Sequence, residues 1–169
     1  MTTANKDFDQ AKLKANTIKL MIFDVDGVLT DGSLIYSSNG EEIKIFNVLD
    51  GYGIKQLVQH GVKTAVISGR SSKALDYRIR DLDINYVYTD VGDDKTKAFN
   101  NLLQKTKLSS NHYGMMGDDI TDLAIIEKCG FSAAPINAIQ QVLNQVDWIS
   151  SKSGGRGAVR EVCDLIISN

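Results

Sequence analysis

The sequence of 169 residues is poor in cysteine, histidine and tryptophan, and its charges nearly cancel, leaving a net charge of −2. Two cysteines, Cys129 and Cys163, are too few for the disulfide framework of a small secreted domain. The small net charge offers no basic surface for nucleic acid or anionic lipid. No apolar run approaches the roughly 20 residues that a membrane-spanning helix needs. We therefore expect a globular cytoplasmic protein with reduced thiols, and neither nucleic acid nor membrane as a partner.

The chain also lacks signs of division into parts. The N-terminal segment MTTANKDFDQAKLKAN is polar and has no apolar core of a secretion signal. The lone proline, Pro135, marks no boundary, and no repeat or linker is visible. A hydrophobic fraction of 43% in a chain of this length fits one domain with a sizeable core. We interpret residues 1–169 as a single domain that ends in a tail and helix at 151–169.

Short apolar or β-branched runs alternate with helical patterns along the chain. The apolar positions between the runs recur at helical spacing. One such pattern contains Ile120, Leu123 and Ala124, and the last contains Val159, Val162 and Ile166. Alternation of this kind predicts an α/β fold with a doubly wound, mostly parallel sheet and helices on both faces. The predicted strands lie at 19–23, 63–67, 86–88, 113–116 and 131–133.

One segment breaks the alternation. SLIYSSNGEEIKIF, residues 33–46, has two short strand patterns around Asn39-Gly40. Asn-Gly is a strong turn signal for two antiparallel strands. We predict a β-hairpin flap here.

Polar side chains follow the apolar runs where each predicted strand ends. In an open parallel sheet, ligands bind outside the carboxyl ends of the strands, so these groups are expected to meet in one crevice. Carboxylates and a hydroxyl without histidine suit Mg²⁺, whose charge offsets that of neighbouring acids. The residues concerned are Asp24 and Asp26, Ser68 and Arg70, Lys95, and Asp118, Asp119 and Asp122 of GDDITD.

Each group has a simpler explanation when it is taken alone. An aspartate at a strand end is often a turn residue or a helix cap. Lys95 fits a solvated position at the start of a helix, and Asp119 and Asp122 fit the dipole of a helix N-terminus. The occurrence of all of them in order, each at a strand end, favours a site.

At these residues the sequence resembles the haloacid dehalogenase superfamily of phosphotransferases. DVDGVLTD, ISGR, Lys95 and GDDITD resemble its four motifs in order. The resemblance implies that Asp24 is the nucleophile that takes the phosphoryl group and that Asp26 is the general acid and base. It also implies that Ser68 and Lys95 bind the phosphoryl oxygens.

The same resemblance implies a magnesium site. Asp24, the main-chain carbonyl of Asp26 and Asp118 are the expected ligands, with Asp119 or Asp122 supporting them. Superfamily cap domains are inserted after the first motif or between the second and third. The interval from Asp31 to Ser68 holds one hairpin and one helix, and the interval from Ser68 to Lys95 holds one helix and one strand. Neither has room for a further domain, so we expect no cap domain.

Four longer segments resemble a capless branch of sugar-acid phosphatases: FDVDGVLTDG, NGEEIKIFNVLDGYGIK, SGRSS and GGRGAVREVCDLI. The resemblance implies a Mg²⁺-dependent phosphatase of an eight-carbon sugar acid used in the inner core of lipopolysaccharide. It also implies a homo-oligomer, a tetramer, in which the hairpin and a neighbour's tail close the site. The substrate-binding residues implied are Asp26, Asn47, Asp50, Gly51, Arg70, Arg78 and Arg156.

Some alternatives stay open. Leu49 stands where an arginine is usual in this branch, which puts the affinity for substrate in question. A related branch acts on nine-carbon sugar acid phosphates and tends to carry an acid where this chain has Arg70, so Arg70 favours the eight-carbon substrate. A signalling receiver domain uses similar groups in a different order and is excluded. A non-catalytic module with this fold is disfavoured by the intact Asp24, Asp26, Ser68 and Lys95.

Overall fold

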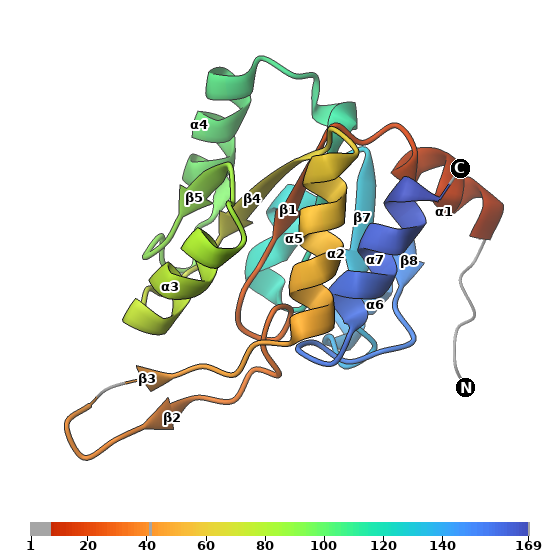
Figure 1. The fold of residues 1–169 in the computed structure, drawn as a ribbon. Helices are drawn as coiled ribbons and strands as arrows, with labels where there is room; N and C mark the ends of the chain where they lie inside the picture. Colours follow the sequence, from red (N-terminus) through yellow and green to blue (C-terminus); the bar gives the residue numbers. More distant parts are fainter. Residues whose placement is uncertain (1–7, 41, 169) are drawn as a thin grey trace.

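Six parallel strands form one sheet in the order β5-β4-β1-β6-β7-β8 (Figure 1). The structure, a computed structural model, describes residues 8–40 and 42–168. Residues 1–7 of the predicted polar leader and the last residue of the predicted tail lie outside this range. The strands of the sheet are β1 (Leu20–Phe23), β4 (Lys63–Ile67), β5 (Tyr86–Tyr88), β6 (Tyr113–Met116), β7 (Phe131–Ala134) and β8 (Trp148–Ile149).

Helices cover both faces of the sheet, because its central strand is apolar on both sides. In β1, Met21 and Phe23 join the core on one face, and Leu20 and Ile22 join the core on the other. This confirms the prediction of a doubly wound α/β fold. The first face carries α1 (Phe8–Ala15), α2 (Val48–Gln59), α3 (Lys73–Asp81) and α7 (Ala158–Ile167), and the second carries α4 (Thr96–Thr106), α5 (Ile120–Ile126) and α6 (Gln140–Leu143). A 3₁₀ turn, η1 (Ser110–His112), precedes β6.

Two details differ from the sequence prediction. Strand β8 was not predicted, because two residues are too short to show a period. In α5 the predicted apolar position Ile120 is 57% exposed, whereas Ile125 and Ile126 are buried. The helix begins directly after its cap, Asp119, and its first residue, Ile120, faces outward, whereas Asp122 in the same turn is buried. Within the described ranges, no helix combines the length and the apolar character needed to cross a membrane.

The hairpin projects from the body of the domain (Figure 1). Its strands are β2 (Ile35–Tyr36) and β3 (Glu42–Ile43), which pair antiparallel. In the turn, the Gly40 amide donates to the Ser37 carbonyl at 3.0 Å, and Gly40 has a φ of +76° that suits glycine. A short two-stranded ribbon of this kind is marginal on its own, so its side chains must find partners elsewhere.

Candidate active site

A cavity of about 210 Å³ lies at the carboxyl ends of β1, β4 and β6. The chain runs from β1 outward through β4 and β5 and then returns to β6 on the other side of β1. The strand order therefore reverses between β1 and β6, which is where a doubly wound sheet places its ligand. The lining brings together seven of the predicted residues, Asp24, Asp26, Ser68, Arg70, Lys95, Asp118 and Asp119, with Gly69, Gly92, Asp93 and Thr121.

Lys95 lies between two carboxylates beneath this cavity. Its Nζ is 2.8 Å from an oxygen of Asp24 and 2.8 Å from an oxygen of Asp122. Lys95 is 3% exposed, Asp24 6% and Asp122 0%. A solvated position for Lys95 is therefore wrong. Burying an ammonium is unfavourable unless charged partners satisfy it, and here two partners do so.

Asp122 also organises the loop that follows β6. Its second carboxylate oxygen accepts from the amides of Asp118 at 3.0 Å and Asp119 at 3.3 Å. Asp119 in turn caps α5, accepting from the Ile120 amide at 2.7 Å. Both oxygens of Asp122 are thus engaged by the protein, and this residue acts by holding the loop that carries Asp118.

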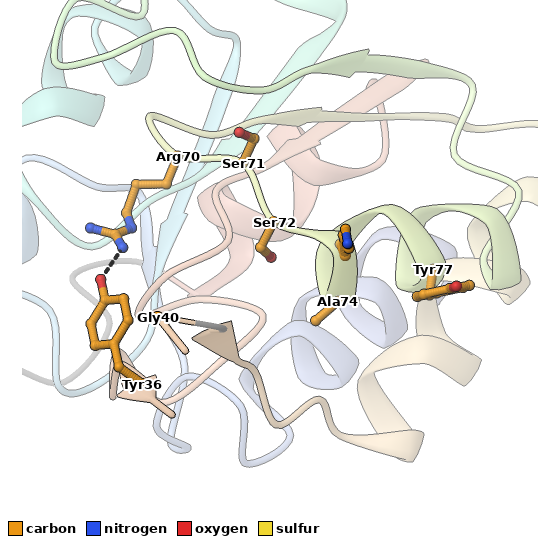
Figure 2. A pocket seen from close by; sticks show the side chains of 8 residues that line it. Tyr36, Gly40, Arg70, Ser71, Ser72, Ala74 and Tyr77 are labelled. Atoms are coloured by element: carbon orange, nitrogen blue, oxygen red, sulfur yellow. Dashed lines mark hydrogen bonds between the residues drawn. The ribbon is translucent and has the colours of Figure 1, made fainter. Parts of the chain in front are cut away.

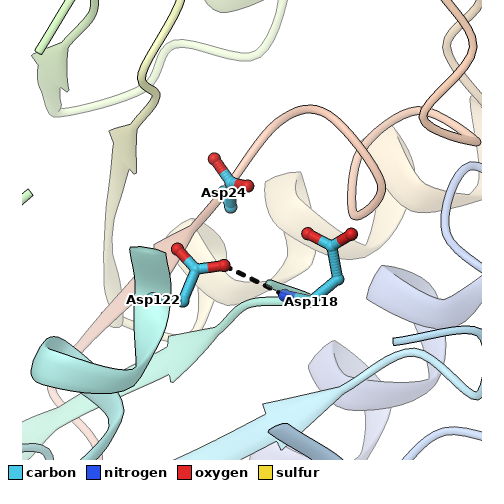
Figure 3. A group of neighbouring side chains, drawn as sticks. All are labelled: Asp24, Asp118 and Asp122. Atoms are coloured by element: carbon cyan, nitrogen blue, oxygen red, sulfur yellow. Dashed lines mark hydrogen bonds between the residues drawn. The ribbon is translucent and has the colours of Figure 1, made fainter. Parts of the chain in front are cut away.

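Asp24 and Asp118 form the part of this cluster that suits a cation. Figure 3 shows their carboxylates together with that of Asp122, and one oxygen from each lies within 4.8 Å of the others. Oδ1 of Asp118 is buried and has no hydrogen-bond partner among the described residues. Burial, reinforced by the neighbouring acids, raises the pKa of Asp118 to about 8 and that of Asp24 to about 7. A divalent ion that prefers oxygen ligands fits this site, because it would supply the missing positive charge.

Asp26 lies two residues beyond Asp24 and is contacted by two cations. Lys44, which follows β3, donates to one carboxylate oxygen, and the Nε of Arg70 is 3.9 Å from the other. Ser68, 2% exposed at the end of β4, accepts from the Arg70 amide at 3.3 Å. Lys44 was missed in the sequence. The signal available was the alternation in EEIKIF, which puts Lys44 on the opposite side of the strand from Ile43 and Ile45.

Five other predicted substrate residues lie elsewhere, and none is among the described residues that line this cavity. Asp50 is 1% exposed and accepts from the amides of Gly157 at 3.3 Å and Arg160 at 2.9 Å. Its carboxylate therefore provides hydrogen-bond acceptors for main-chain amides at the start of α7. Helix α2, which carries Asp50, packs along α7 (Figure 1). The five residues are Asn47, Asp50, Gly51, Arg78 and Arg156.

Arg78 connects α3 to the start of α2. Its guanidinium donates to the Asn47 carbonyl at 2.7 Å and lies 5.6 Å from the ring centroid of Phe46. A Cβ at Gly51 would lie 2.3 Å from Nη2 of Arg78, so a larger residue there would displace the guanidinium from this position. Asn47 caps α2, accepting from the Leu49 amide at 2.7 Å.

The glycine-rich tail packs against the loop that carries Asp26. The Gly155 amide donates to the Val28 carbonyl at 2.9 Å, and a Cβ at Gly154 would lie 1.7 Å from the Gly27 carbonyl oxygen. Arg156 has an exposed side chain, 3.4 Å from Asp31. The glycines of the tail therefore allow its backbone to approach the chain's own loop after β1.

Comparison with known proteins agrees with this geometry. A family model for haloacid dehalogenase-like hydrolases matches residues 88–162. The 3-deoxy-D-manno-octulosonate 8-phosphate phosphatase KdsC of Escherichia coli (strain K12) is 42% identical over 154 residues, which are 91% of this chain and 81% of the relative. The crystal structure of the corresponding phosphatase from Yersinia pestis has a TM-score of 0.91 at 39% identity, covering 94% of this chain and 85% of that chain.

A third relative was solved with ligands. The Moraxella catarrhalis phosphatase, in complex with a magnesium ion, a phosphate ion and a KDO molecule, has a TM-score of 0.92 at 41% identity, covering 95% of this chain and 92% of that chain. Fold and site together are those of a haloacid dehalogenase-like hydrolase, as the sequence motifs predicted. Within that class, the chain belongs to the 3-deoxy-D-manno-octulosonate 8-phosphate phosphatase family.

Proposed function

We propose that this chain is a Mg²⁺-dependent phosphatase that hydrolyses 3-deoxy-D-manno-octulosonate 8-phosphate to the free sugar acid and phosphate. The product would serve the inner core of lipopolysaccharide. The observation that carries the proposal is the convergence of Asp24, Asp26, Ser68, Lys95 and Asp118 on one cavity at the sheet's switch point. Identity of 42% with octulosonate phosphatases over 91% of the chain supports the choice of substrate.

In the first step, a carboxylate oxygen of Asp24 attacks phosphorus, and the bond to the sugar oxygen breaks. Asp26 gives its proton to that oxygen, so the sugar leaves as an alcohol. Lys95, already 2.8 Å from Asp24, offsets the negative charge on the phosphoryl oxygens, and the Ser68 hydroxyl donates to them. Forming an acyl phosphate divides one difficult displacement into two easier ones.

In the second step, the ionised Asp26 takes a proton from water, whose oxygen attacks the phosphorus of the acyl phosphate. Phosphate leaves, and Asp24 regains its carboxylate. The same group thus acts as acid and then as base. Because Asp26 lines the cavity that contains Asp24, one side chain is placed for both transfers.

Asp24, Asp118 and the main-chain carbonyl of Asp26 would hold the magnesium ion. When bound, Mg²⁺ supplies positive charge to the phosphoryl oxygens and to the buried carboxylates. Asp122 would support the site indirectly, because both of its oxygens are engaged by Lys95 and by the amides of the loop.

A homo-oligomer, a tetramer by the family resemblance, is part of the proposal. The projecting hairpin exposes four apolar side chains, Ile35, Tyr36, Ile43 and Ile45, which are 40–60% accessible. Grouped apolar surface of this kind favours burial against another chain. We place the enzyme in the cytoplasm, where its free thiols Cys129 and Cys163 would remain reduced.

Phosphate release from a panel of substrates tests the function. The panel contains the eight-carbon sugar acid 8-phosphate, a nine-carbon sugar acid 9-phosphate and p-nitrophenyl phosphate, each with Mg²⁺ and with excess EDTA. We expect kcat/KM to be highest on the eight-carbon substrate and to vanish in EDTA. A preference for the nine-carbon substrate would contradict the assignment, and full activity in EDTA would contradict the metal. Sedimentation velocity gives the number of subunits.

A further inference from the structure

The hairpin buries a charge and exposes its apolar residues, which reverses the usual arrangement. The Lys44 side chain is 1% exposed, whereas its neighbours Ile43 and Ile45 are 51% and 60% exposed. Burying a lysine ammonium is unfavourable unless a partner compensates for its lost hydration. The buried Lys44 therefore needs a specific explanation.

Lys44 has Asp26 as a partner. The Lys44 ammonium donates to Oδ1 of Asp26, and the two residues are 18 positions apart in sequence. Asp26 itself is positioned at the edge of the catalytic cavity, with 22% of its side chain exposed. The hairpin thus reaches into the active site through one lysine.

The other strand of the hairpin reaches the same carboxylate indirectly. The Arg70 guanidinium donates to the Tyr36 hydroxyl of β2 (Figure 2), and its Nε is 3.9 Å from Oδ2 of Asp26. One oxygen of Asp26 is therefore contacted by Lys44 and the other is approached by Arg70. Lys44 belongs to the hairpin, and Arg70 contacts it through Tyr36.

We propose that Lys44 is a positioning residue, which holds the Asp26 carboxyl group at the cavity and thereby makes proton transfer to the leaving group depend on how the hairpin is seated. This inference rests on the proposed function, in which Asp26 is the general acid. Proton transfer needs the acid within about 2.6–3.2 Å of the leaving oxygen. A carboxyl group that is free to rotate spends less time at that distance, and Lys44 removes this freedom.

If Lys44 positions the general acid, the loss of activity on replacing Lys44 should depend on the leaving group of the substrate. Nitrophenolate is a good leaving group and needs little help from an acid, whereas phenolate is a poorer one and needs more. Lys44→Met keeps the length of the side chain and removes the charge. We expect its kcat/KM to fall at least tenfold more on phenyl phosphate than on p-nitrophenyl phosphate. Asp26→Asn should show the same pattern with a larger loss.

A double variant separates positioning from a second, independent role. If Lys44 acts through Asp26, adding Lys44→Met to Asp26→Asn should cause little further loss, because coupled residues are not additive. Lys44→Arg should restore part of the activity on phenyl phosphate. Lys19→Met, an exposed lysine at the opposite end of β1, is the matched control and should behave as wild type.

Three outcomes would overturn the proposal. An equal loss on both aryl phosphates would reduce Lys44 to a structural contact. Additive losses in the double variant would give it a role independent of Asp26. Loss confined to the sugar acid phosphate would make it a substrate-binding residue. The aryl phosphates carry no sugar acid, so the test holds even if the proposed substrate is wrong. Circular dichroism checks folding, and Lys44→Gln replaces the methionine variant if that one unfolds.

Discussion

The floor of the candidate active site and its hairpin wall are built in opposite ways. In the floor, Asp24, Lys95 and Asp122 are almost fully buried, and their charges are matched within one chain. In the wall, Ile35, Tyr36, Ile43 and Ile45 are exposed, whereas Lys44 turns inward. Phosphoryl transfer needs charges that are fixed before the reaction, and a rigid sheet edge supplies them. Binding a sugar acid requires contacts on several sides of the ligand. The hairpin of one chain provides only some of these sides.

Replacing Asp24, the proposed nucleophile on the floor, should have the largest effect. In Asp24→Asn the amide is a poor nucleophile, so we expect turnover to fall on the order of 10⁴-fold or more on every substrate. No phosphorylated protein should appear in rapid acid quench followed by mass spectrometry. Asp83→Asn, at an exposed turn with a φ of +52° that asparagine also accepts, is the control. Retained phosphorylation in Asp24→Asn would assign the nucleophile to another group.

Removing Mg²⁺ should reveal how the floor depends on a cation. Without the ion, Asp24 has a pKa of about 7 and Asp118 a pKa of about 8, against 3.8 ordinarily. As pH rises from about 4 to about 8, the unfolded chain loses these protons first. The folded state then binds more protons than the unfolded state, so the free energy of unfolding falls across this window, by an amount on the order of a few kcal/mol.

A bound ion would take the place of these protons, so the rise in Tm on adding Mg²⁺ should depend on pH. Saturating Mg²⁺ should raise Tm more at pH 8 than at pH 5, as followed by calorimetry. In Asp118→Asn the difference between the two pH values should shrink, because one of the two titrating ligands is gone. A rise in Tm that is equal at both pH values would mean that the ion binds away from these carboxylates.

Replacing Gly154 with alanine should displace the loop after β1 that the tail packs against. A Cβ at Gly154 would collide with the Gly27 carbonyl, so Gly154→Ala must move the loop that carries Asp26. Overpacking of this kind typically costs about 1–3 kcal/mol of stability. We expect that loss in denaturant unfolding, with kcat reduced about tenfold on both p-nitrophenyl phosphate and the sugar acid phosphate. Ser153→Ala is the neighbouring control. A loss confined to the sugar acid phosphate would indicate that the tail contacts substrate instead.

The sequence predicted the floor better than the wall, for a physical reason. Asp24, Ser68 and Asp118 each follow an apolar run, and parallel strands bring their carboxyl ends to one edge. Knowing the strands was therefore enough to bring these residues together. The two-residue strand β8 shows no period, and it was missed for that reason.

Contacts between distant segments were harder to predict. Asp50 was predicted to bind substrate. Its hydrogen-bond partners Gly157 and Arg160, more than 100 positions away at the start of α7, were not predicted. Lys44 contacts Asp26, which lies 18 positions earlier in the loop after β1. Local patterns encode which face a side chain occupies. They do not encode which element packs there, and these two residues depend on that.

The smallest expected effect comes from Leu49→Arg, which tests whether substrate contacts extend beyond the hairpin wall to α2. Leu49 is 56% exposed on the first turn of α2, just beyond the hairpin, at the position where the family resemblance leads us to expect an arginine. If the bound sugar acid extends toward the first turn of α2, the guanidinium of Leu49→Arg can pair with its carboxylate. At an exposed position such a pair contributes about 0.2–1 kcal/mol. We expect KM for the octulosonate phosphate to fall about twofold to fivefold. KM for p-nitrophenyl phosphate, which lacks the carboxylate, should stay the same. Leu49→Gln separates charge from size and should change neither value. Improvement on both substrates, or with glutamine as well, would mean that removing exposed apolar surface matters more than the new charge.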